Sequence, residues 1–295
     1  MSSHEPSKPL RIPQWLRIKL PRNKNFSCTG DLLRDMGLNT VCQSAKCPNI
    51  YECFSRRVAT FLILGNVCTR NCAFCNIEPG HDFAAPDPTE PDRVARAAQT
   101  LGLAHVVITS VTRDDLPDGG AAHFAATMRA VKAAMPACTT EVLIPDFKGD
   151  PAALHTVLDA APDIVNHNVE TVPSLYPAIR PQADYAQSLE LLARVKQAGH
   201  TAKSGLMVGL GESDNQIYDV IIALARIGCD IVTVGQYMQP TRHHPLVQRY
   251  VYPTTFYEYE ACGRAHGIPH MHCAPLVRSS YNAAKFVKGE ERENG

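Results

Sequence analysis

The stretch VCQSAKCPNIYECFSRRVATFLILGNVCTRNCAFCNIEPG, residues 41–80, holds most of the cysteines of this 295-residue chain. They fall into two triplets, with the spacings C-x4-C-x5-C and C-x3-C-x2-C. The first triplet comprises Cys42, Cys47 and Cys53, and the second comprises Cys68, Cys72 and Cys75. Between them, the apolar run ATFLILG at residues 59–65 predicts a buried strand. One triplet therefore precedes a strand and the other follows it.

Three thiolates at such short spacing can converge on one metal centre. Thiolate is a soft ligand that favours iron–sulfur clusters, zinc or Cu(I). Structural zinc sites usually contain C-x2-C pairs and close with four ligands. A cubane cluster of four irons usually takes four thiolates, so three leave one iron open to a substrate or cofactor. The alternative is that some of these cysteines are inert buried thiols. That alternative does not explain why two triplets lie next to each other.

From residue 60 onward, apolar runs alternate with helix-patterned segments. We expect strands at 60–64, 104–109, 140–144, 163–168, 201–209 and 230–235, with helices at 90–102, 118–135, 150–161, 183–198 and 213–227. A last helix at 254–266 precedes a strand-like run at 270–277. This alternation predicts an α/β fold with parallel strands. Six units fit a partial (β/α)6 barrel, because a complete barrel needs eight.

Upstream of the cysteines, residues 11–21 read RIPQWLRIKLP. Leu16, Ile18 and Leu20 alternate with basic residues, which predicts a strand. Residues 8–24 contain six basic residues and no acidic one. We expect an arm that packs on the barrel, or alternatively a basic surface that docks an acidic partner.

Composition excludes several classes of protein. The 29 basic and 29 acidic residues cancel, so no strong field favours nucleic acid or a membrane surface. No apolar run approaches the length of a membrane span, and the N-terminus lacks the apolar core of a signal peptide. An odd number of cysteines, 11, cannot all be paired in disulfides. Thiolate clusters persist in reducing compartments, so we expect a cytoplasmic protein.

At this point the sequence resembles a known family. The segment CTRNCAFC, residues 68–75, resembles the signature of radical S-adenosylmethionine (SAM) enzymes. The first triplet, within VCQSAKCPNIYECF, resembles that of one branch of these enzymes, the lipoyl synthases. The match continues to RSSY at residues 278–281, which resembles the closing motif of that branch. Two triplets together with RSSY form a highly specific combination.

The resemblance implies two [4Fe–4S] clusters and SAM as cofactors. One cluster would be held by Cys68, Cys72 and Cys75, and its open iron would bind SAM. The other, auxiliary cluster would be held by Cys42, Cys47 and Cys53 with a serine as the fourth ligand. By match to the family pattern that serine is Ser280, with Ser279 as the alternative. A hard alkoxide on a soft cluster is a weak, displaceable ligand, which suits a cluster that is consumed.

The resemblance also implies the reaction. A 5′-deoxyadenosyl radical from SAM would abstract hydrogen from an octanoyl chain in amide linkage to a carrier-protein lysine. Sulfur from the auxiliary cluster would then add at C6 and C8 to form the lipoyl group. The implied catalytic residues are Cys68, Cys72, Cys75 and Ser280.

The predicted strand ends are unusually polar. Polar side chains within apolar runs need partners, and sites gather at the carboxyl ends of parallel strands. By resemblance, these positions bind SAM: Thr109, Ser110, Arg113, Asp114, Asn168, Glu170, Lys203, Ser204 and Gly205. Arg113 and Asp114 could instead form an ion pair with each other. A second set, His266, His270, His272 and Cys273, fits none of the usual zinc spacings, so we expect surface or strand residues there.

The predicted organisation has three parts: residues 1–55 as an extension with the auxiliary-cluster cysteines, 56–268 as the barrel, and 269–295 as a C-terminal extension. The implied partners are octanoylated lipoyl carrier domains (the glycine cleavage H protein and E2 subunits of 2-oxo acid dehydrogenases), a flavodoxin or ferredoxin as reductant, and a cluster-donor protein. The alternatives are another two-cluster radical SAM sulfur inserter, such as a methylthiotransferase, and a non-catalytic iron–sulfur carrier.

Overall fold

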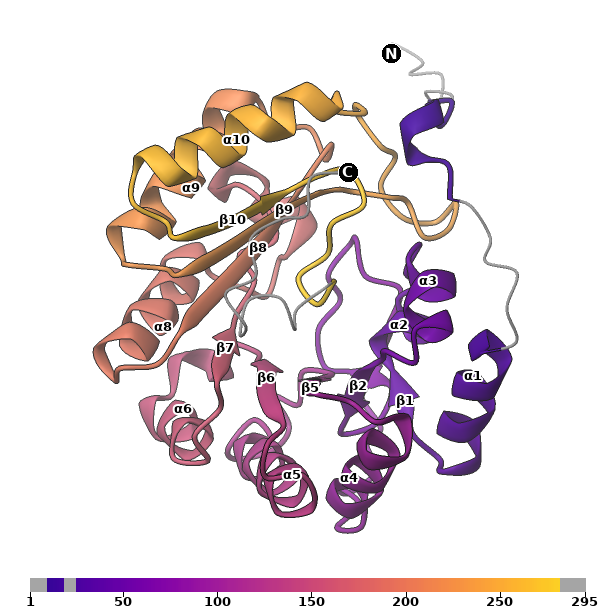
Figure 1. Cartoon of the computed structure of the whole chain (residues 1–295). Helices are drawn as coiled ribbons and strands as arrows, with labels where there is room; N and C mark the ends of the chain where they lie inside the picture. The colour runs from indigo at the N-terminus through magenta and orange to yellow at the C-terminus, as the bar shows by residue number, and fades with distance from the viewer. Residues whose placement is uncertain (1–9, 19–24, 282–295) are drawn as a thin grey trace.

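An eight-stranded, mostly parallel sheet forms the centre of the molecule, as Figure 1 shows. The computed structural model describes residues 10–18 and 25–281. The strand order is β1-β2-β5-β6-β7-β8-β9-β10. The strands are β1 (Asn39–Thr40), β2 (Thr60–Ile63), β5 (His105–Ser110), β6 (Thr139–Leu143), β7 (Ile164–Asn166), β8 (Ala202–Val208), β9 (Ile231–Gln236) and β10 (His270–Cys273). Only β1 pairs antiparallel, with β2. The predicted α/β class with a partial barrel is confirmed.

Helices cover the outer face of this curved sheet (Figure 1). They are α4 (Glu90–Leu101), α5 (Ala121–Ala134), α6 (Pro151–Leu158), α8 (Tyr185–Gln197), α9 (Asp214–Arg226) and α10 (Pro253–Ala265). Local signals set their ends. Pro91 lies in the first turn of α4, and Gly102 ends that helix with φ of 69°. Ser213 and Gln216 form a capping box at the start of α9.

Several short elements surround the cysteine triplets. They are α1 (Asn25–Asp35), α2 (Val41–Ser44), α3 (Ile50–Ser55), β3 (Val67–Cys68) and β4 (Glu78–Pro79). The 3-10 helices η2 (Phe147–Gly149) and η3 (Pro173–Leu175) and the short helix α7 (Tyr176–Ile179) follow β6 and β7. β1 and β10 belong to the predicted N-terminal and C-terminal extensions, and both join the barrel sheet.

The predicted strand at residues 11–21 is wrong for its described part. Gln14–Leu16 form the 3-10 helix η1. Leu16 is buried, and the Trp15 ring packs on Tyr252 with 5.1 Å between ring centroids. Leu20 lies outside the described residues. Trp15 therefore packs beside the start of α10, and the alternation of Leu16 and Ile18 does not mark a strand.

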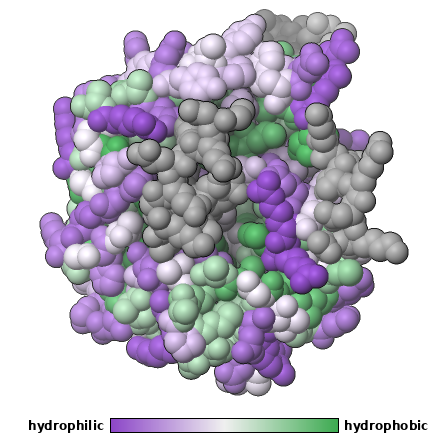
Figure 2. Space-filling model, viewed as in Figure 1, coloured by the Kyte–Doolittle hydropathy of each residue, from purple (hydrophilic) through white to green (hydrophobic). Residues whose placement is uncertain are grey.

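The residues of the central strands β2, β5, β6, β7, β8 and β9 are buried almost throughout, because both faces of the sheet are covered. Residues of β2 and β6 are buried along with the inner faces of α4 and α5. The register places the carboxyl ends of β2, β5 and β6 together, with Ile63 opposite Ser110 and Thr109 opposite Leu143. In the view of Figure 2, hydrophilic residues spread around the rim, and hydrophobic residues are visible toward the centre. Within the described ranges, no helix has the length and apolar character needed to cross a bilayer.

Candidate active site

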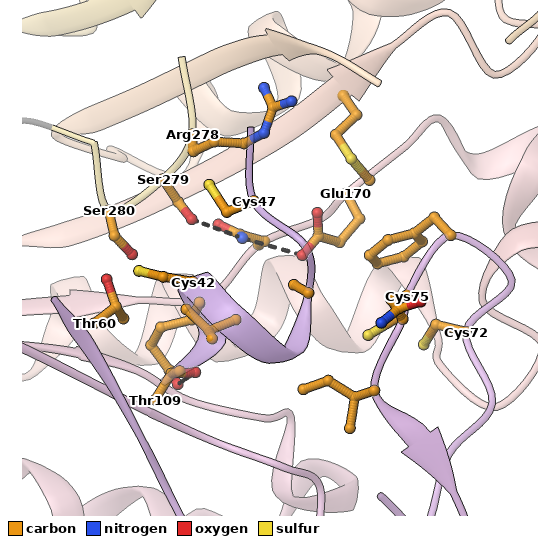
Figure 3. A pocket seen from close by; sticks show the side chains of 18 of the residues that line it. Cys42, Cys47, Thr60, Cys72, Cys75, Thr109, Glu170, Arg278, Ser279 and Ser280 are labelled. Carbon is orange, nitrogen blue, oxygen red and sulfur yellow. Dashed lines mark hydrogen bonds between the residues drawn. The ribbon is translucent and has the colours of Figure 1, made fainter. Parts of the chain in front are cut away.

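A cavity of about 340 Å³ lies at the carboxyl ends of the strands. All six cysteines of the two triplets line it. The C-terminal residues 278–281 line it too, although they are more than 200 positions away from the cysteines in the sequence. In Figure 3, Cys42 and Cys47 lie on one side of the pocket, and Cys72 and Cys75 lie on the other. The fold therefore brings the three sequence motifs to one chamber.

The first triplet is carried by the two short helices α2 and α3. Thr40 caps α2 by accepting a hydrogen bond from the backbone N–H of Gln43 at 3.3 Å. Cys42 lies in α2 and Cys53 in α3, with Cys47 in the turn between them. Burial raises the pKa of Cys42 to about 11. Burial and the neighbouring cysteines raise the pKa of Cys53 to about 12. These raised pKa values favour the protonated thiols of Cys42 and Cys53, and binding a metal would deprotonate them.

The second triplet starts at the end of β3 and continues into a loop. Two backbone N–H groups point at the Cys68 sulfur, from Arg70 at 3.4 Å and from Thr112 at 3.3 Å. Burial raises the pKa of Cys75 to about 12, and the Cys72 pKa is also raised. The two N–H groups hold the Cys68 sulfur in place at the edge of the cavity.

Each triplet offers three thiolates, which are the usual ligands of an iron–sulfur cluster. Among the residues that the structure describes, no three His, Cys, Asp or Glu side chains are close enough to share one metal ion. The thiolates of a cubane cluster instead bind different irons and stand farther apart. Two polar atoms at the cavity, Ser110 Oγ and Asn168 Oδ1, are buried and have no hydrogen-bond partner among the described residues. Such orphaned atoms suit a polar ligand.

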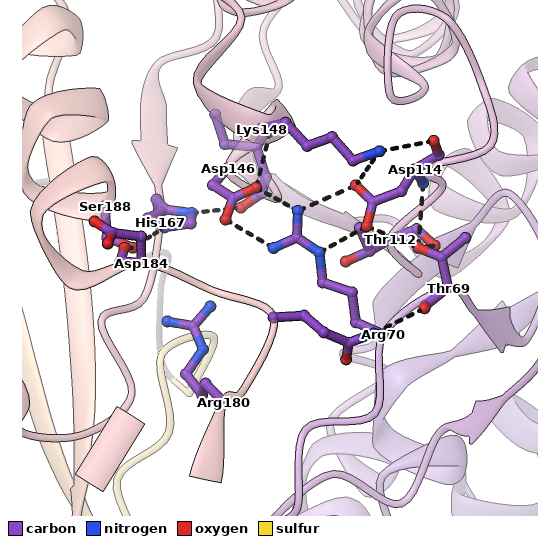
Figure 4. Close-up of polar contacts among 12 residues, drawn as sticks. Thr69, Arg70, Thr112, Asp114, Asp146, Lys148, His167, Arg180, Asp184 and Ser188 are labelled. Atoms are coloured by element: carbon purple, nitrogen blue, oxygen red, sulfur yellow. Dashed lines mark hydrogen bonds and ion pairs between the residues drawn. The ribbon is translucent and has the colours of Figure 1, made fainter. Parts of the chain in front are cut away.

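Arg70, between the cysteines of the second triplet, anchors the loop to the barrel. Figure 4 shows its guanidinium between Asp114 and Asp146. It donates to Asp114 at 2.8 and 3.1 Å and to Asp146 at 2.6 and 2.7 Å. Burial alone raises the pKa of Asp146, but the hydrogen bonds from Arg70 outweigh it and lower that pKa below its usual value. The Asp146 carboxylate is therefore ionised, and the hydrogen bonds from Arg70 to both aspartates hold the loop.

The residues predicted after β5 separate into two pairs. Thr109 and Ser110 line the cavity. Arg113 and Asp114 are not among its lining residues. The suggested ion pair between these two is wrong, because Arg113 pairs with Asp115 at 2.8 Å and Asp114 pairs with Arg70.

The polar residues Asn168 and Glu170, after β7, line the cavity. Asn168 donates to Glu170 Oε1 at 3.0 Å and to Ser279 Oγ at 3.2 Å. Glu170 adopts a positive φ of 64°, which is uncommon for a residue other than glycine. Burial raises the pKa of Glu170, while Arg180 and the hydrogen bond from Asn168 oppose that rise. The structure thus links the β7 rim to the RSSY motif.

The three predicted residues of β8 lie away from the cavity. Lys203 is fully buried and donates to both carboxylate oxygens of Glu141 at 2.9 Å. Ser204 Oγ donates to the carbonyl of His167 at 2.9 Å. A Cβ on Gly205 would lie 2.5 Å from Thr233 Oγ1, so the glycine permits close strand packing. Lys203 and Gly205 lie on one face of β8 and Ser204 on the other, and none of the three is among the residues that line the cavity.

The two serines of RSSY point to different parts of the cavity. In Figure 3, Ser280 lies beside Cys42 and Thr60, whereas Ser279 points toward Glu170. Arg278, at the start of the motif, is half-buried and lines the same cavity. Burial lowers its pKa, and the nearby Cys47 and Glu170 act against this change.

Sequence reasoning missed two residues beside the second triplet. Arg180, at the end of α7, donates to the carbonyls of Asn168 and Val169 at 3.1 and 3.3 Å. Its only sequence signal is a lone basic residue in the connection after β7. His244 Nε2 donates to the Cys75 carbonyl at 3.0 Å, and this contact spans 169 residues, so no local pattern marks it.

The histidine-rich stretch has its expected surroundings. His266 ends α10, and its ring donates to the Cys262 carbonyl at 2.8 Å. His270 is exposed at the start of β10, whereas Cys273 is buried at its end.

Comparison with known proteins now identifies the chain. The model of the radical SAM superfamily matches residues 62–224. Solved structures agree on the fold. Methylornithine synthase (PylB) is 14% identical, with a TM-score of 0.53 over 90% of this chain and 88% of the other. Streptococcus suis SuiB bound to S-adenosylmethionine is 13% identical, with a TM-score of 0.54 over 80% of this chain and 56% of the other. The chain is a member of the radical SAM superfamily.

The relatives narrow this class to one family. The model for the N-terminal domain of lipoyl synthase matches residues 2–47. The lipoyl synthase of Oleidesulfovibrio alaskensis is 67% identical over 98% of this chain and 99% of its own length. That of Nitratidesulfovibrio vulgaris is 68% identical over 96% and 95%, and that of Caldanaerobacter subterraneus is 52% identical over 93% and 96%. This chain belongs to the lipoyl synthase family, as the sequence predicted.

Proposed function

We propose that this chain inserts two sulfur atoms, at C6 and C8, into an octanoyl chain held in amide linkage to a carrier-protein lysine. The product is the lipoyl group, and the enzyme is a sulfurtransferase of the radical SAM type. Membership of the lipoyl synthase family supports this reaction. The observation that carries it is the convergence of two three-cysteine groups and a serine motif on one cavity.

The second triplet, Cys68, Cys72 and Cys75, holds a [4Fe–4S] cluster with one open iron for SAM. When bound, the cluster and SAM supply the one-electron chemistry that breaks an unactivated C–H bond, which no side-chain base can do. The backbone N–H groups of Arg70 and Thr112 orient the Cys68 sulfur for this role. The anchoring of the loop to two strand ends fixes where the open iron lies.

SAM occupies the rim of the cavity beside this triplet. Ser110 and Asn168 present polar atoms that lack protein partners within the described chain. Glu170 is positioned for a cationic group of the ligand, and Thr109 lines the wall. The other predicted contacts, Arg113, Asp114, Lys203, Ser204 and Gly205, are left out of this proposal, because they do not line the cavity.

The first triplet, Cys42, Cys47 and Cys53, holds the auxiliary [4Fe–4S] cluster that supplies sulfur. Ser280 is the proposed fourth ligand. Its place beside Cys42 supports this choice (Figure 3). The engagement of Ser279 by Asn168 at 3.2 Å supports it further.

The partners follow from the chemistry. The octanoyl group arrives on a lipoyl carrier domain, either the glycine cleavage H protein or an E2 subunit of a 2-oxo acid dehydrogenase. A flavodoxin or ferredoxin supplies electrons, and a cluster-donor protein replaces the consumed cluster. Exposed thiolate clusters persist under reducing conditions, which supports a cytoplasmic location. In the proposed organisation, residues 56–268 form the barrel, and residues 1–55 and 269–295 are its N-terminal and C-terminal extensions.

An anaerobic product assay tests the function. The reconstituted protein is mixed with SAM, reductant and an octanoyl-lysine carrier domain, and the carrier is weighed by mass spectrometry. A gain of two sulfurs per octanoyl group, accompanied by 5′-deoxyadenosine, is expected. Deoxyadenosine without added sulfur would contradict the sulfur insertion but leave radical SAM chemistry standing. If protein with a full iron count forms neither product, the result would favour a non-catalytic iron–sulfur carrier.

A further inference from the structure

The segment after β10, residues 276–281, is hydrogen-bonded at both ends to the residues that lie between Cys47 and Cys53. Asn49 Nδ2 donates to the Leu276 carbonyl at 2.7 Å. The Tyr281 hydroxyl donates to Glu52 Oε1 at 3.0 Å. In Figure 1 this yellow segment runs across the mouth of the barrel toward α2 and α3. Both anchoring residues, Asn49 and Glu52, lie in the spacer between Cys47 and Cys53.

The side chain of Asn49 does not cap the helix that it precedes. It occupies the N-cap position of α3, where an asparagine side chain normally accepts a hydrogen bond from the helix backbone. Here its side chain makes no capping hydrogen bond. Its amide reaches instead to Leu276, which is 227 residues away, and the residue is only 4% exposed. A buried amide that forgoes a local cap for a distant carbonyl indicates that the distant contact is built into the fold.

The two anchors bracket the serine motif. Leu276 precedes Arg278 by two residues, and Tyr281 directly follows Ser280. Consecutive Cα atoms are about 3.8 Å apart, so a fixed Tyr281 leaves Ser280 little freedom. Asn168 holds the intervening Ser279 from the other side of the cavity at 3.2 Å. Three contacts therefore hold this segment, at Leu276, Ser279 and Tyr281.

We propose that Asn49 and Glu52 are positioning residues that hold segment 276–281 so that Ser280 stands at the auxiliary-cluster cysteines. This inference rests on the proposed role of Ser280 as a cluster ligand. The spacer of the first triplet thus does more than separate cysteines. Its residues Asn49 and Glu52 bind segment 276–281. They thereby place Ser280 beside the cysteines of the auxiliary cluster.

The reason for such anchoring is chemical. A serine oxygen is a poor match for a soft iron–sulfur cluster, and its bond is weak. A weak ligand on a loose chain end would leave readily, and its iron would be exposed to solvent. Holding the segment at both ends raises the local concentration of the hydroxyl at the cluster. The ligand then remains displaceable without being lost between turnovers.

The test uses the reconstituted holoenzyme with SAM bound and measures iron release to a chelator. Tyr281→Phe removes only the hydroxyl, and Asn49→Ser removes the amide while keeping a capping residue. Glu52→Gln retains an acceptor oxygen for Tyr281 and serves as the conservative rescue. Tyr218→Phe is the matched control, because its hydroxyl also donates to a glutamate, Glu258, at 3.4 Å, but between α9 and α10.

We expect Tyr281→Phe and Asn49→Ser to release half of the iron, that of the auxiliary cluster, about tenfold faster than the wild type. Hydrogen exchange of the amides in 276–281 should accelerate in parallel. Glu52→Gln and the control should stay within about twofold of the wild type. Unchanged iron release and unchanged exchange in both Tyr281→Phe and Asn49→Ser would overturn the inference.

A Ser280→Ala variant separates this inference from the function on which it rests. If Ser280→Ala releases auxiliary iron rapidly but the anchor variants do not, the positioning role fails and the ligand role of Ser280 stands. If Ser280→Ala itself releases iron at the wild-type rate, the ligand role fails, and the inference fails with it.

Discussion

Removing the Arg70 side chain should destabilise the chain strongly, although Arg70 lies in a loop. Its guanidinium makes four hydrogen bonds to Asp114 and Asp146, with distances from 2.6 to 3.1 Å. The Arg70 side chain is 6% exposed and that of Asp146 is 1% exposed. Arg70→Met therefore leaves a buried carboxylate with one remaining partner, the backbone N–H of Lys148 at 3.0 Å, among the hydrogen bonds of the described chain.

The size of the effect follows from that burial. Breaking a buried ion pair by removing one partner costs about 3–5 kcal/mol, since the other charge stays uncompensated. Removing both partners costs less than the sum of the single changes. We expect a coupling energy of about 1–3 kcal/mol between Arg70→Met and Asp146→Leu. The control is Arg34→Ala, because the Arg34–Asp31 pair is exposed on α1 and should contribute no more than about 1 kcal/mol.

Urea unfolding of the cluster-free chain, followed by circular dichroism, measures these free energies. The same Arg70→Met protein should also take up less iron during reconstitution, because the loop that carries the second triplet is no longer held at the strand ends. A free energy of unfolding within about 1 kcal/mol of the wild type would refute the reasoning. Additive effects of Arg70→Met and Asp146→Leu would refute it as well.

Three further predictions test other parts of the account. Ser280→Ala should keep deoxyadenosine formation but reduce sulfur insertion at least about tenfold, whereas Ser279→Ala should retain most insertion; equal losses in a product assay would contradict the assignment. Burial lowers the pKa of His167 from 6.5 to about 4. Between these pH values the unfolded chain therefore binds more protons than the folded chain. The free energy of unfolding should fall by up to about 3 kcal/mol as the pH drops from 6.5 to 4. His167→Gln should flatten this slope in urea unfolding at pH 7 and pH 4.5, and an unchanged slope would count against it. Lys203→Met leaves Glu141 buried without its cation and should lower the urea midpoint of unfolding markedly. The Kd for SAM, measured by equilibrium dialysis, should stay within about twofold of the wild type. A large loss of SAM affinity would show that Lys203 belongs to the SAM site.

The sequence predicted the barrel well because its signals are local. Apolar runs, helix caps and glycine stops placed six parallel strands and the helices between them within a few residues of their observed ends. The helix at Asn25–Asp35 was not predicted. Its stability depends on contacts that are distant in sequence, such as the Thr29 hydroxyl donating to the Phe54 carbonyl at 2.8 Å. A pattern within one segment cannot reveal such a partner.

The site was predicted in part, for a geometric reason. Motif spacing identified the cysteines, the resemblance to a family motif identified the serines, and the structure brings them to one cavity. The assignment of Lys203 to the SAM site did not take into account its position along β8. Lys203 is the second residue of that strand, paired with Asn166 and Ile231, whereas Met207 near the carboxyl end lines the cavity. Polarity within a strand shows that a partner exists, but only the register shows which one.

The contacts of Arg70 and His244, which hold the loop of the second triplet, were also beyond sequence reasoning. Arg70 reaches Asp146 and His244 reaches the Cys75 carbonyl, and each contact joins segments that are far apart in the chain. Arg70 was visible between the cysteines, but nothing local indicates that Asp146 comes to meet it.

The central claim is that the two cysteine triplets hold two clusters with different tasks. One measurement addresses it directly: deoxyadenosine and inserted sulfur, quantified together for two triple variants under anaerobic conditions. The variants are Cys68→Ala/Cys72→Ala/Cys75→Ala and Cys42→Ala/Cys47→Ala/Cys53→Ala. The first should form neither product, and the second should form deoxyadenosine but add no sulfur to the octanoyl carrier. Sulfur insertion by the second variant, or deoxyadenosine from the first, would contradict the account.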